Sequence, residues 1–175
     1  MAQRDDLRRI RFWLAVFIIG LILSGVTAFP LQREINWLVS SLRTGALQPV
    51  AELTHVLPWI ERVQEGLNTT NARFPFIAYG TDWLAFAHMV IAIAFIGPYI
   101  DPVRNKWVIS FGLICCAGVF PLALIAGQVR GIPLGWRLID CSFGVFGSVP
   151  LLLCRPSIYR LEHPISEAAA VHTAV

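Results

Sequence analysis

The sequence predicts an all-α fold: a four-transmembrane-helix bundle with short amphipathic helices in the first outer loop. Hydrophobic residues make up 56% of the 175 residues and charged residues only 14%, whereas soluble domains are roughly 45–50% apolar and about 25% charged. Four apolar stretches each approach the roughly 20 residues that cross a bilayer. Short connections join the last three stretches. We therefore expect a single integral membrane domain over residues 1–175, because no part of the chain can bury a separate core.

The first span is expected over about residues 10–30. Its apolar run is longer than the roughly 7–15 residues of a signal-peptide core. The segment Thr27-Ala28-Phe29-Pro30 is also a poor cleavage site, because it lacks the required pattern of small residues. We interpret this run as a retained transmembrane helix.

The outer loop, residues 31–76, is predicted to be helical. Apolar residues recur at helical spacing in two groups, which Gly45 separates. We expect Pro58 to bend the second group, and Gly66 with the polar run 68–71 to end it. The pattern favours two short amphipathic helices that lie on the outer membrane surface or cap the bundle. The groups are Ile35, Leu38, Val39 and Leu42, then Val50, Leu53, Leu57, Ile60 and Leu67.

Three further spans follow, at about residues 77–97, 107–127 and 134–154. Pro121 is expected to kink the second of these three. Their connections are short, so these helices should be sequential antiparallel neighbours. The predicted ends of the three spans are Gly97-Pro98, Gly127 and Arg155-Pro156. Small residues that permit close helix contact are Gly20, Ser24, Gly112, Gly144 and Gly147.

The distribution of basic residues predicts the orientation. With the N-terminus inside, eight Lys and Arg residues flank the inner helix ends and five lie outside. The excess of basic residues inside favours both termini in the cytoplasm. We expect a multi-pass protein, with the bacterial cytoplasmic membrane (the cell inner membrane) as its location. The tail after His163 is expected to be a frayed end.

Three ionisable residues lie well inside the predicted spans: His88, Arg137 and Asp140. An ionised side chain at mid-membrane costs about 2.5–3.5 kcal/mol on insertion scales, so such residues usually face a partner, a cavity or a ligand. Arg137 and Asp140 are three positions apart and can pair within one helix. Asp140 lies roughly 10 Å, and His88 roughly 16 Å, from the outer end of its own helix. We therefore expect one polar network in the outer half of the bundle.

Two interpretations of this network remain open. In the structural one, the three side chains join two helices through interhelical hydrogen bonds. In the functional one, they line a site. His88 is then a proton carrier or ligand, Asp140 orients it, and Arg137 holds an anionic group.

A second candidate group lies at the outer mouth of the second span, where Tyr79, Thr81 and Asp82 occur close together. Asp82 complements the helix dipole as a first-turn acid, and Thr81 or Asp82 is expected to cap the helix. The alternative places Tyr79 and Asp82, with Gln128 and Arg130 of a later loop, around an opening to the outer aqueous phase.

We expect no cofactor, metal or nucleic acid. Only one histidine lies within a span, and a bis-His haem site would require His55 to leave the polar face of its loop helix; haem and quinone remain minor alternatives. The four cysteines lie in or at the ends of spans without a companion zinc set, which is typical of small buried hydrophobic residues. The basic residues form no stripe with interleaved aromatics such as a nucleic-acid groove requires.

Three classes of function follow. The leading one is a non-enzymatic accessory or structural membrane subunit, whose loop helices dock a membrane protein partner. The second is a binder or transporter of a small lipophilic or anionic ligand, in an outer-half cavity lined by His88, Arg137 and Asp140. The third is an intramembrane redox or acid–base enzyme that uses His88 and Asp140. No P-loop, GxSxG, HExxH or dinucleotide motif occurs in the chain.

Overall fold

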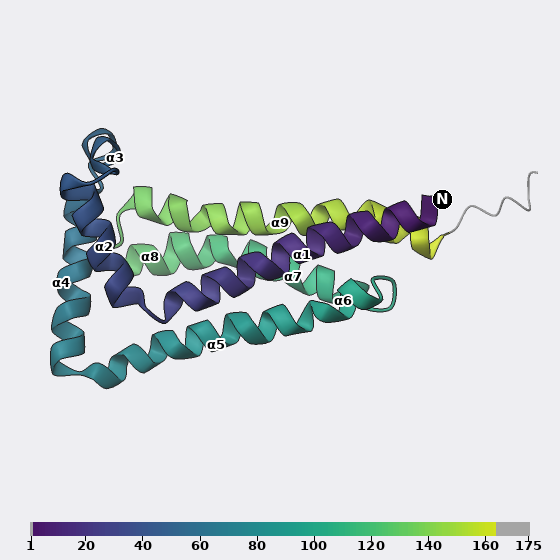
Figure 1. Cartoon of the computed structure of the whole chain (residues 1–175), viewed down its shortest axis with the longest axis horizontal. Helices are drawn as coiled ribbons and strands as arrows, with labels where there is room; N and C mark the ends of the chain where they lie inside the picture. Colours follow the sequence, from purple (N-terminus) through teal and green to yellow (C-terminus); the bar gives the residue numbers. More distant parts are fainter. Residues whose placement is uncertain (1, 164–175) are drawn as a thin grey trace, which may run out of the picture. The chain divides into compact units, whose positions relative to one another are not determined.

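A computed structural model describes residues 2–163, and every regular element within them is helical. The described chain divides into two compact units: unit 1 holds residues 2–19 and 92–163, and unit 2 holds residues 20–91. The expected frayed tail lies outside the described residues. In chain order (Figure 1) the elements are α1 (Ala2–Ala28), α2 (Leu31–Thr44), α3 (Gln48–Thr54), α4 (Leu57–Arg73), the 3₁₀ turn η1 (Pro75–Ala78), α5 (Tyr79–Ala94), α6 (Ile96–Ile100), α7 (Lys106–Pro121), the π-turn η2 (Leu122–Ala126), α8 (Gly127–Val129) and α9 (Leu134–Glu162).

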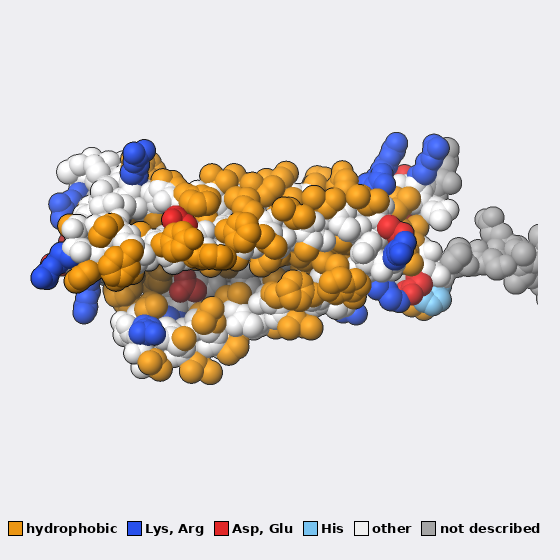
Figure 2. Space-filling model, turned by 90° about the horizontal axis from the view of Figure 1, so that it is seen from below, with side chains coloured by type: hydrophobic (Ala, Val, Ile, Leu, Met, Phe, Trp, Pro, Cys, Tyr) orange, Lys and Arg blue, Asp and Glu red, His pale blue; other side chains and the backbone are white. Residues whose placement is uncertain are grey.

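Four helical stretches are long and apolar enough to cross a membrane, as the sequence predicts. They cover Gln3–Ala28, Pro75–Ile100, Lys106–Val129 and Leu134–Glu162. Only 17% to 28% of the residues in their most apolar windows are buried. Figure 2 shows hydrophobic side chains over most of the visible surface of the long helices. Such open apolar surface is typical of helices that face lipid.

The last helix runs further than predicted. The expected end at Arg155-Pro156 is wrong, because α9 continues through Pro156 to Glu162. A proline inside a helix removes one backbone hydrogen bond, but neighbouring packing can compensate. Here α1 packs against this part of α9: Cys154 is fully buried, and its thiol donates to the carbonyl oxygen of Ile10 (3.7 Å).

In unit 1, α7 and α9 lie side by side (Figure 1) and approach each other closely at small residues. A Cβ added at Gly144 would lie 2.6 Å from the carbonyl oxygen of Cys116, and one at Gly147 would lie 3.1 Å from the Cys116 sulfur. A Cβ at Gly112 would lie 2.7 Å from Cδ1 of Leu151. The prediction that these three glycines permit close helix contact is confirmed.

A π-turn follows Pro121. The helix does not end there but passes through Leu122–Ala126 in π geometry, and the Gly127 amide bonds the Leu122 carbonyl five residues earlier. π-Turns inside helices occur frequently at functional sites, because their wider hydrogen-bond pattern alters which carbonyl groups are free. The helix is therefore irregular over the five residues after Pro121, while the predicted kink at Pro121 stays a prediction.

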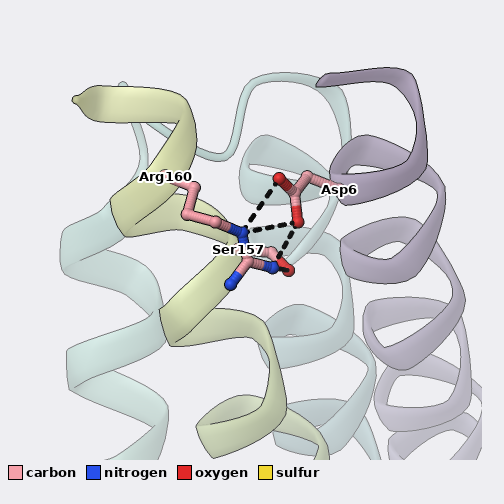
Figure 3. A network of polar contacts seen from close by, with 3 residues as sticks. All are labelled: Asp6, Ser157 and Arg160. Atoms are coloured by element: carbon pink, nitrogen blue, oxygen red, sulfur yellow. Dashed lines mark hydrogen bonds and ion pairs between the residues drawn. The ribbon is translucent and has the colours of Figure 1, made fainter. Parts of the chain in front are cut away.

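Polar side chains join α1 and α9 where α1 begins and α9 ends (Figure 3). The Nε atom of Arg160 lies 3.1 Å from each carboxylate oxygen of Asp6, and its Nη2 donates to Asp6 and to the Ser157 hydroxyl, the latter at 2.9 Å. Ser157 is fully buried, and the Asp6 side chain is only 13% exposed. Lys106 and Glu162 form a second ion pair. The first contact joins α1 to α9, and the second joins α7 to α9.

In unit 2, α2 packs against α4 (Figure 1). Their apolar faces bury Ile35, Val39 and Leu42 of α2 and Ile60 of α4. These are four of the residues whose helical spacing predicted amphipathic helices. The sequence pattern therefore identified these four buried positions, whereas Val50 and Leu53, predicted on the same apolar face, are exposed.

The loop nevertheless contains three helices rather than the predicted two. α3 ends at His55, whose φ of 51° is left-handed, and α4 begins at Leu57. Pro58 lies in the first turn of α4, where its missing N–H costs no helical hydrogen bond. It therefore helps to start a helix instead of bending one. α4 also continues through Gly66, the predicted end, to Arg73.

The second half of α1 approaches α5 within unit 2 at Gly25. A Cβ at Gly25 would lie 3.0 Å from both the Ala85 carbonyl oxygen and Cβ of His88. Nothing in unit 2 lies within 4 Å of a Cβ placed at Gly20, so Gly20 makes no close helix contact within this unit. Ser24 is exposed. Gly25, rather than its two predicted neighbours, makes the close approach.

Candidate functional site

The predicted polar trio is divided between the two units. His88 lies on α5 in unit 2, whereas Arg137 and Asp140 lie on α9 in unit 1. Their convergence on one network stays a prediction. What the structure adds is the local geometry of each residue.

His88 is half-buried and has a defined hydrogen bond. Its Nδ1 lies 2.8 Å from the carbonyl oxygen of Leu84, one turn earlier on α5. A carbonyl oxygen only accepts, so the hydrogen of a neutral imidazole is assigned to Nδ1. Nε2 is then an acceptor. A Cβ added at Gly25 of α1 would lie 3.0 Å from Cβ of His88, so within unit 2 α1 packs closely against this part of α5.

Arg137 contacts the π-turn. Its Nη1 donates to the Leu124 carbonyl oxygen at 3.1 Å, and its methylene groups lie over Gly127, where a Cβ would come within 2.7 Å of Cδ. Its Nε is buried and, among the described residues, has no hydrogen-bond acceptor. A buried donor without an acceptor costs about 1–3 kcal/mol. Arg137 therefore has one N–H available to an acceptor from outside this set of contacts.

The predicted ion pair between Arg137 and Asp140 is wrong for the described part of the chain. Arg137 turns to the Leu124 carbonyl instead, and no ion pair between residues 2 and 163 includes Asp140. The Asp140 carboxylate is half-buried and accepts no hydrogen bond from any described residue. The Arg137 guanidinium and the Asp140 carboxylate thus lie within one turn of α9 without forming a hydrogen bond or ion pair with each other.

At the start of α5, Tyr79 and Asp82 line a pocket of about 360 Å³, together with Phe29, Trp83 and Phe86. Asp82 lies in the first turn of α5, as predicted. The predicted capping role fails, because no backbone amide among the described residues donates to Thr81 or Asp82. The Thr81 hydroxyl donates to the Ala78 carbonyl at 2.6 Å.

A second pocket in unit 2, of about 240 Å³, has Thr81, Gln32 and Asn71 among its lining residues. A chain of side-chain amides runs along it: Asn71 donates to Gln32 (2.7 Å), and Gln32 donates to Asn68 (2.9 Å). This chain joins the start of α2 to the end of α4. Because the Gln32 and Asn71 amides already bond other side chains, much of the polar lining of this pocket stabilises the packing of α2 on α4.

Gln128 and Arg130 are exposed and belong to unit 1. Their predicted grouping with Tyr79 and Asp82 therefore joins residues of different units and stays a prediction.

The other candidates are placed as follows. His55 is exposed at the end of α3. Three cysteines are buried thiols, as expected, but Cys115 is exposed. Among the described residues, no group of three or more His, Cys, Asp or Glu side chains is arranged to hold a metal ion.

Sequence reasoning grouped Tyr79 with Asp82 but missed the other aromatic neighbours Phe29, Trp83 and Phe86. It also missed the Asp6–Ser157–Arg160 network. A signal for the former was present, because Tyr79, Trp83 and Phe86 share one helical face at spacings of four and three. For the latter the charges of Asp6 and Arg160 lie far apart in sequence, and only the packing of α1 on α9 joins them.

The described chain is thus all-helical, with four helices suited to a membrane and polar groups near the beginning of α5 and the π-turn. Comparison with protein-family models, curated proteins and solved structures found no match to the chain.

Proposed function

We propose that this chain is a non-enzymatic integral membrane protein, an accessory or structural subunit with both termini on the cytoplasmic side of a bacterial cytoplasmic membrane. The open apolar surface of its four long helices supports this proposal most directly. Such surface needs lipid or the helices of a partner to cover it. The basic residues near the helix ends support the orientation.

The outer loop supports the idea of a partner. Trp37 of α2 is 67% exposed and Leu53 of α3 is 83% exposed, although the helices that carry them have their own buried faces. Exposed apolar side chains mark an interaction surface where they form a contiguous patch, and we propose that Trp37 and Leu53 contribute to one. A membrane protein partner would cover these residues.

Photo-crosslinking in native membranes tests the docking role. A benzophenone side chain placed at Leu53 should give one protein adduct of discrete mass. The same group at Glu65, an exposed polar position of α4, should give little or none. Lipid adducts alone, or equal protein adducts at both positions, would exclude docking through this loop.

Cysteine labelling tests the orientation. In a chain without its native cysteines, a membrane-impermeant maleimide should label Glu65→Cys in intact cells. It should label Arg104→Cys, in the turn before α7, only after lysis. The reverse pattern would place the termini outside.

A second function is supported by Arg137, whose buried Nε has no acceptor in the described structure. An anionic or lipophilic ligand with an acceptor group would satisfy it. Mass spectrometry of gently purified protein should then find a bound small molecule that Arg137→Gln loses. If the same molecule is retained by this variant, Arg137 is not its binding residue.

A further inference from the structure

The pocket at the start of α5 combines one carboxylate with four aromatic rings. Tyr79 and Trp83 lie edge to face with their ring centroids 6.0 Å apart, and Trp83 and Phe86 do the same at 5.9 Å. Phe29, which follows α1, completes the wall around Asp82. All five residues belong to unit 2, so the pocket is complete within one unit.

The carboxylate of Asp82 is half-buried and has no cation of its own. No ion pair or side-chain hydrogen bond among residues 2–163 includes it. Within unit 2, Arg43 pairs with Glu61 at 2.7 Å, and Arg73 lies over the ring of Phe74. A carboxylate partly surrounded by aromatic rings loses hydration, and a cationic ligand would compensate for that loss.

The lining indicates which cation fits. A divalent metal needs six or more oxygen ligands, and this wall offers one carboxylate. A primary ammonium has three N–H donors, and the wall offers only the Asp82 carboxylate and the Tyr79 hydroxyl as side-chain acceptors, so a primary ammonium gains less here than in a site with a full set of acceptors. A quaternary ammonium has no N–H donor, and aromatic faces together with an anion are what recognise it in proteins. The pocket therefore suits a trimethylammonium group.

The surface beyond the pocket suits an acyl chain. Tyr79, Trp83, Phe86 and Val90 follow one another at spacings of four, three and four on one face of α5, and each is at least 47% exposed. They form an apolar stripe that begins at the pocket and continues along a helix apolar enough to cross a membrane. A ligand with a cationic head and a hydrocarbon tail would contact both features.

We infer that Asp82, Phe29, Tyr79, Trp83 and Phe86 form a binding site for the headgroup of a lipid that carries a trimethylammonium group, with an acyl chain along the exposed stripe of α5. This inference is independent of the proposed docking role, because it requires no protein partner and involves none of the exposed residues of α2 and α3.

Native mass spectrometry tests the inference. The full chain, purified in maltoside micelles, is incubated with phosphatidylcholine, phosphatidylethanolamine and phosphatidylglycerol of identical acyl chains. Phosphatidylcholine should be retained about fivefold more than either competitor, which corresponds to a modest cation–π contribution. Equal retention of the three lipids would overturn the inference.

Matched variants locate the effect. Asp82→Asn removes the charge and Trp83→Leu removes a ring, and each should abolish the preference for phosphatidylcholine. Glu65→Gln and Phe146→Leu change an exposed acid and an exposed ring elsewhere and should leave it intact. If Asp82→Asn fails to fold, judged by circular dichroism, Trp83→Leu decides the result. A preference unchanged in Trp83→Leu would overturn the site.

A final arm separates a lipid from a free cation. Excess choline chloride should displace little phosphatidylcholine, because choline lacks the tail. Complete displacement by choline at concentrations close to that of the lipid would show that a soluble cation is the ligand and would overturn the lipid assignment.

Discussion

Arg160 donates to the carboxylate of Asp6, with Nε 3.1 Å from both carboxylate oxygens, and so joins residues 154 positions apart. The contact links the start of α1 to the last turns of α9 (Figure 3). It also orients the fully buried hydroxyl of Ser157, which interacts with the same guanidinium. The contact therefore brings together residues near the two ends of the described chain.

Asp6→Asn should lower the unfolding midpoint of the chain in detergent, measured by thermal denaturation. The amide cannot replace the charge-assisted bonds to Arg160, and the fully buried Ser157 hydroxyl loses its organised partner. Asp5→Asn is the matched control, since Asp5 is exposed and makes no hydrogen bond or ion pair in the described structure. If Asp6→Asn and Arg160→Gln act through one contact, the double variant should be little worse than either alone. Fully additive effects would show that the two residues act separately.

Gly144→Ala should destabilise unit 1 by about 1–3 kcal/mol, the usual cost of overpacking. The added methyl would meet the Cys116 carbonyl oxygen at 2.6 Å, and a backbone atom cannot move aside as a side chain can. The helices α7 and α9 would have to separate. Unfolding by SDS in mixed micelles measures the change. Gly118→Ala on α7 is the control, because nothing lies within 4 Å of its added Cβ. Alanine has the higher helix propensity, so the control should be neutral or stabilising. If Gly144→Ala is equally neutral or stabilising, overpacking at Gly144 is excluded.

Length and composition of the apolar runs were enough to predict the four long helices, because crossing a bilayer depends on those properties alone. The buried residues Ile35, Val39 and Leu42 followed in the same way from helical spacing. What sequence could not give were the helix ends. Prolines stop isolated helices, but Pro156 is tolerated where α1 packs against α9.

The candidate site shows a different limit. The spacing of three residues shows that the Arg137 side chain can reach Asp140. It does not show which acceptor the guanidinium binds when several are within reach. The π-turn supplies a competing acceptor, the Leu124 carbonyl, and the pattern of residues around Pro121 indicates only some irregularity there. The aromatic wall around Asp82 likewise includes Phe29, which the sequence places near the end of the first predicted span, without any signal that it lies beside Asp82.

Gly127→Ala should disturb the contact between Arg137 and the π-turn. The new methyl would lie 2.7 Å from Cδ of Arg137, so the side chain must shift and the bond to Leu124 should break. We expect a loss of about 1 kcal/mol, the net value of one hydrogen bond, measured by SDS unfolding. Gly135→Ala, where nothing lies within 4 Å, is the control. Gly127→Ala combined with Arg137→Met should cost no more than Arg137→Met alone; a further loss would mean that Gly127 acts through another contact.

The predicted convergence of His88 with Asp140 can be tested by a short cross-link. The two residues are expected at depths that agree within one helical turn. Nδ1 of His88 is engaged by the Leu84 carbonyl, which leaves Nε2 for another partner, and Arg137, on the same helix as Asp140, has a buried Nε donor without an acceptor among the described residues. In a chain without native cysteines, His88→Cys with Asp140→Cys should therefore be joined by a short bis-methanethiosulfonate reagent, because a contact between the two native side chains holds their Cβ atoms farther apart than the roughly 3.5–4.5 Å of a disulfide.

His88→Cys with Phe146→Cys is the matched control for this pair, since Phe146 is 72% exposed and lies about 9 Å further along α9. Only the first pair should cross-link, and a longer bis-maleimide should not be needed. If the first pair reacts only with the long reagent, or no better than the second, His88 lies too far from Asp140 for a shared network. His88, Arg137 and Asp140 then cannot line one ligand cavity, and the Arg137 donor must find its acceptor elsewhere.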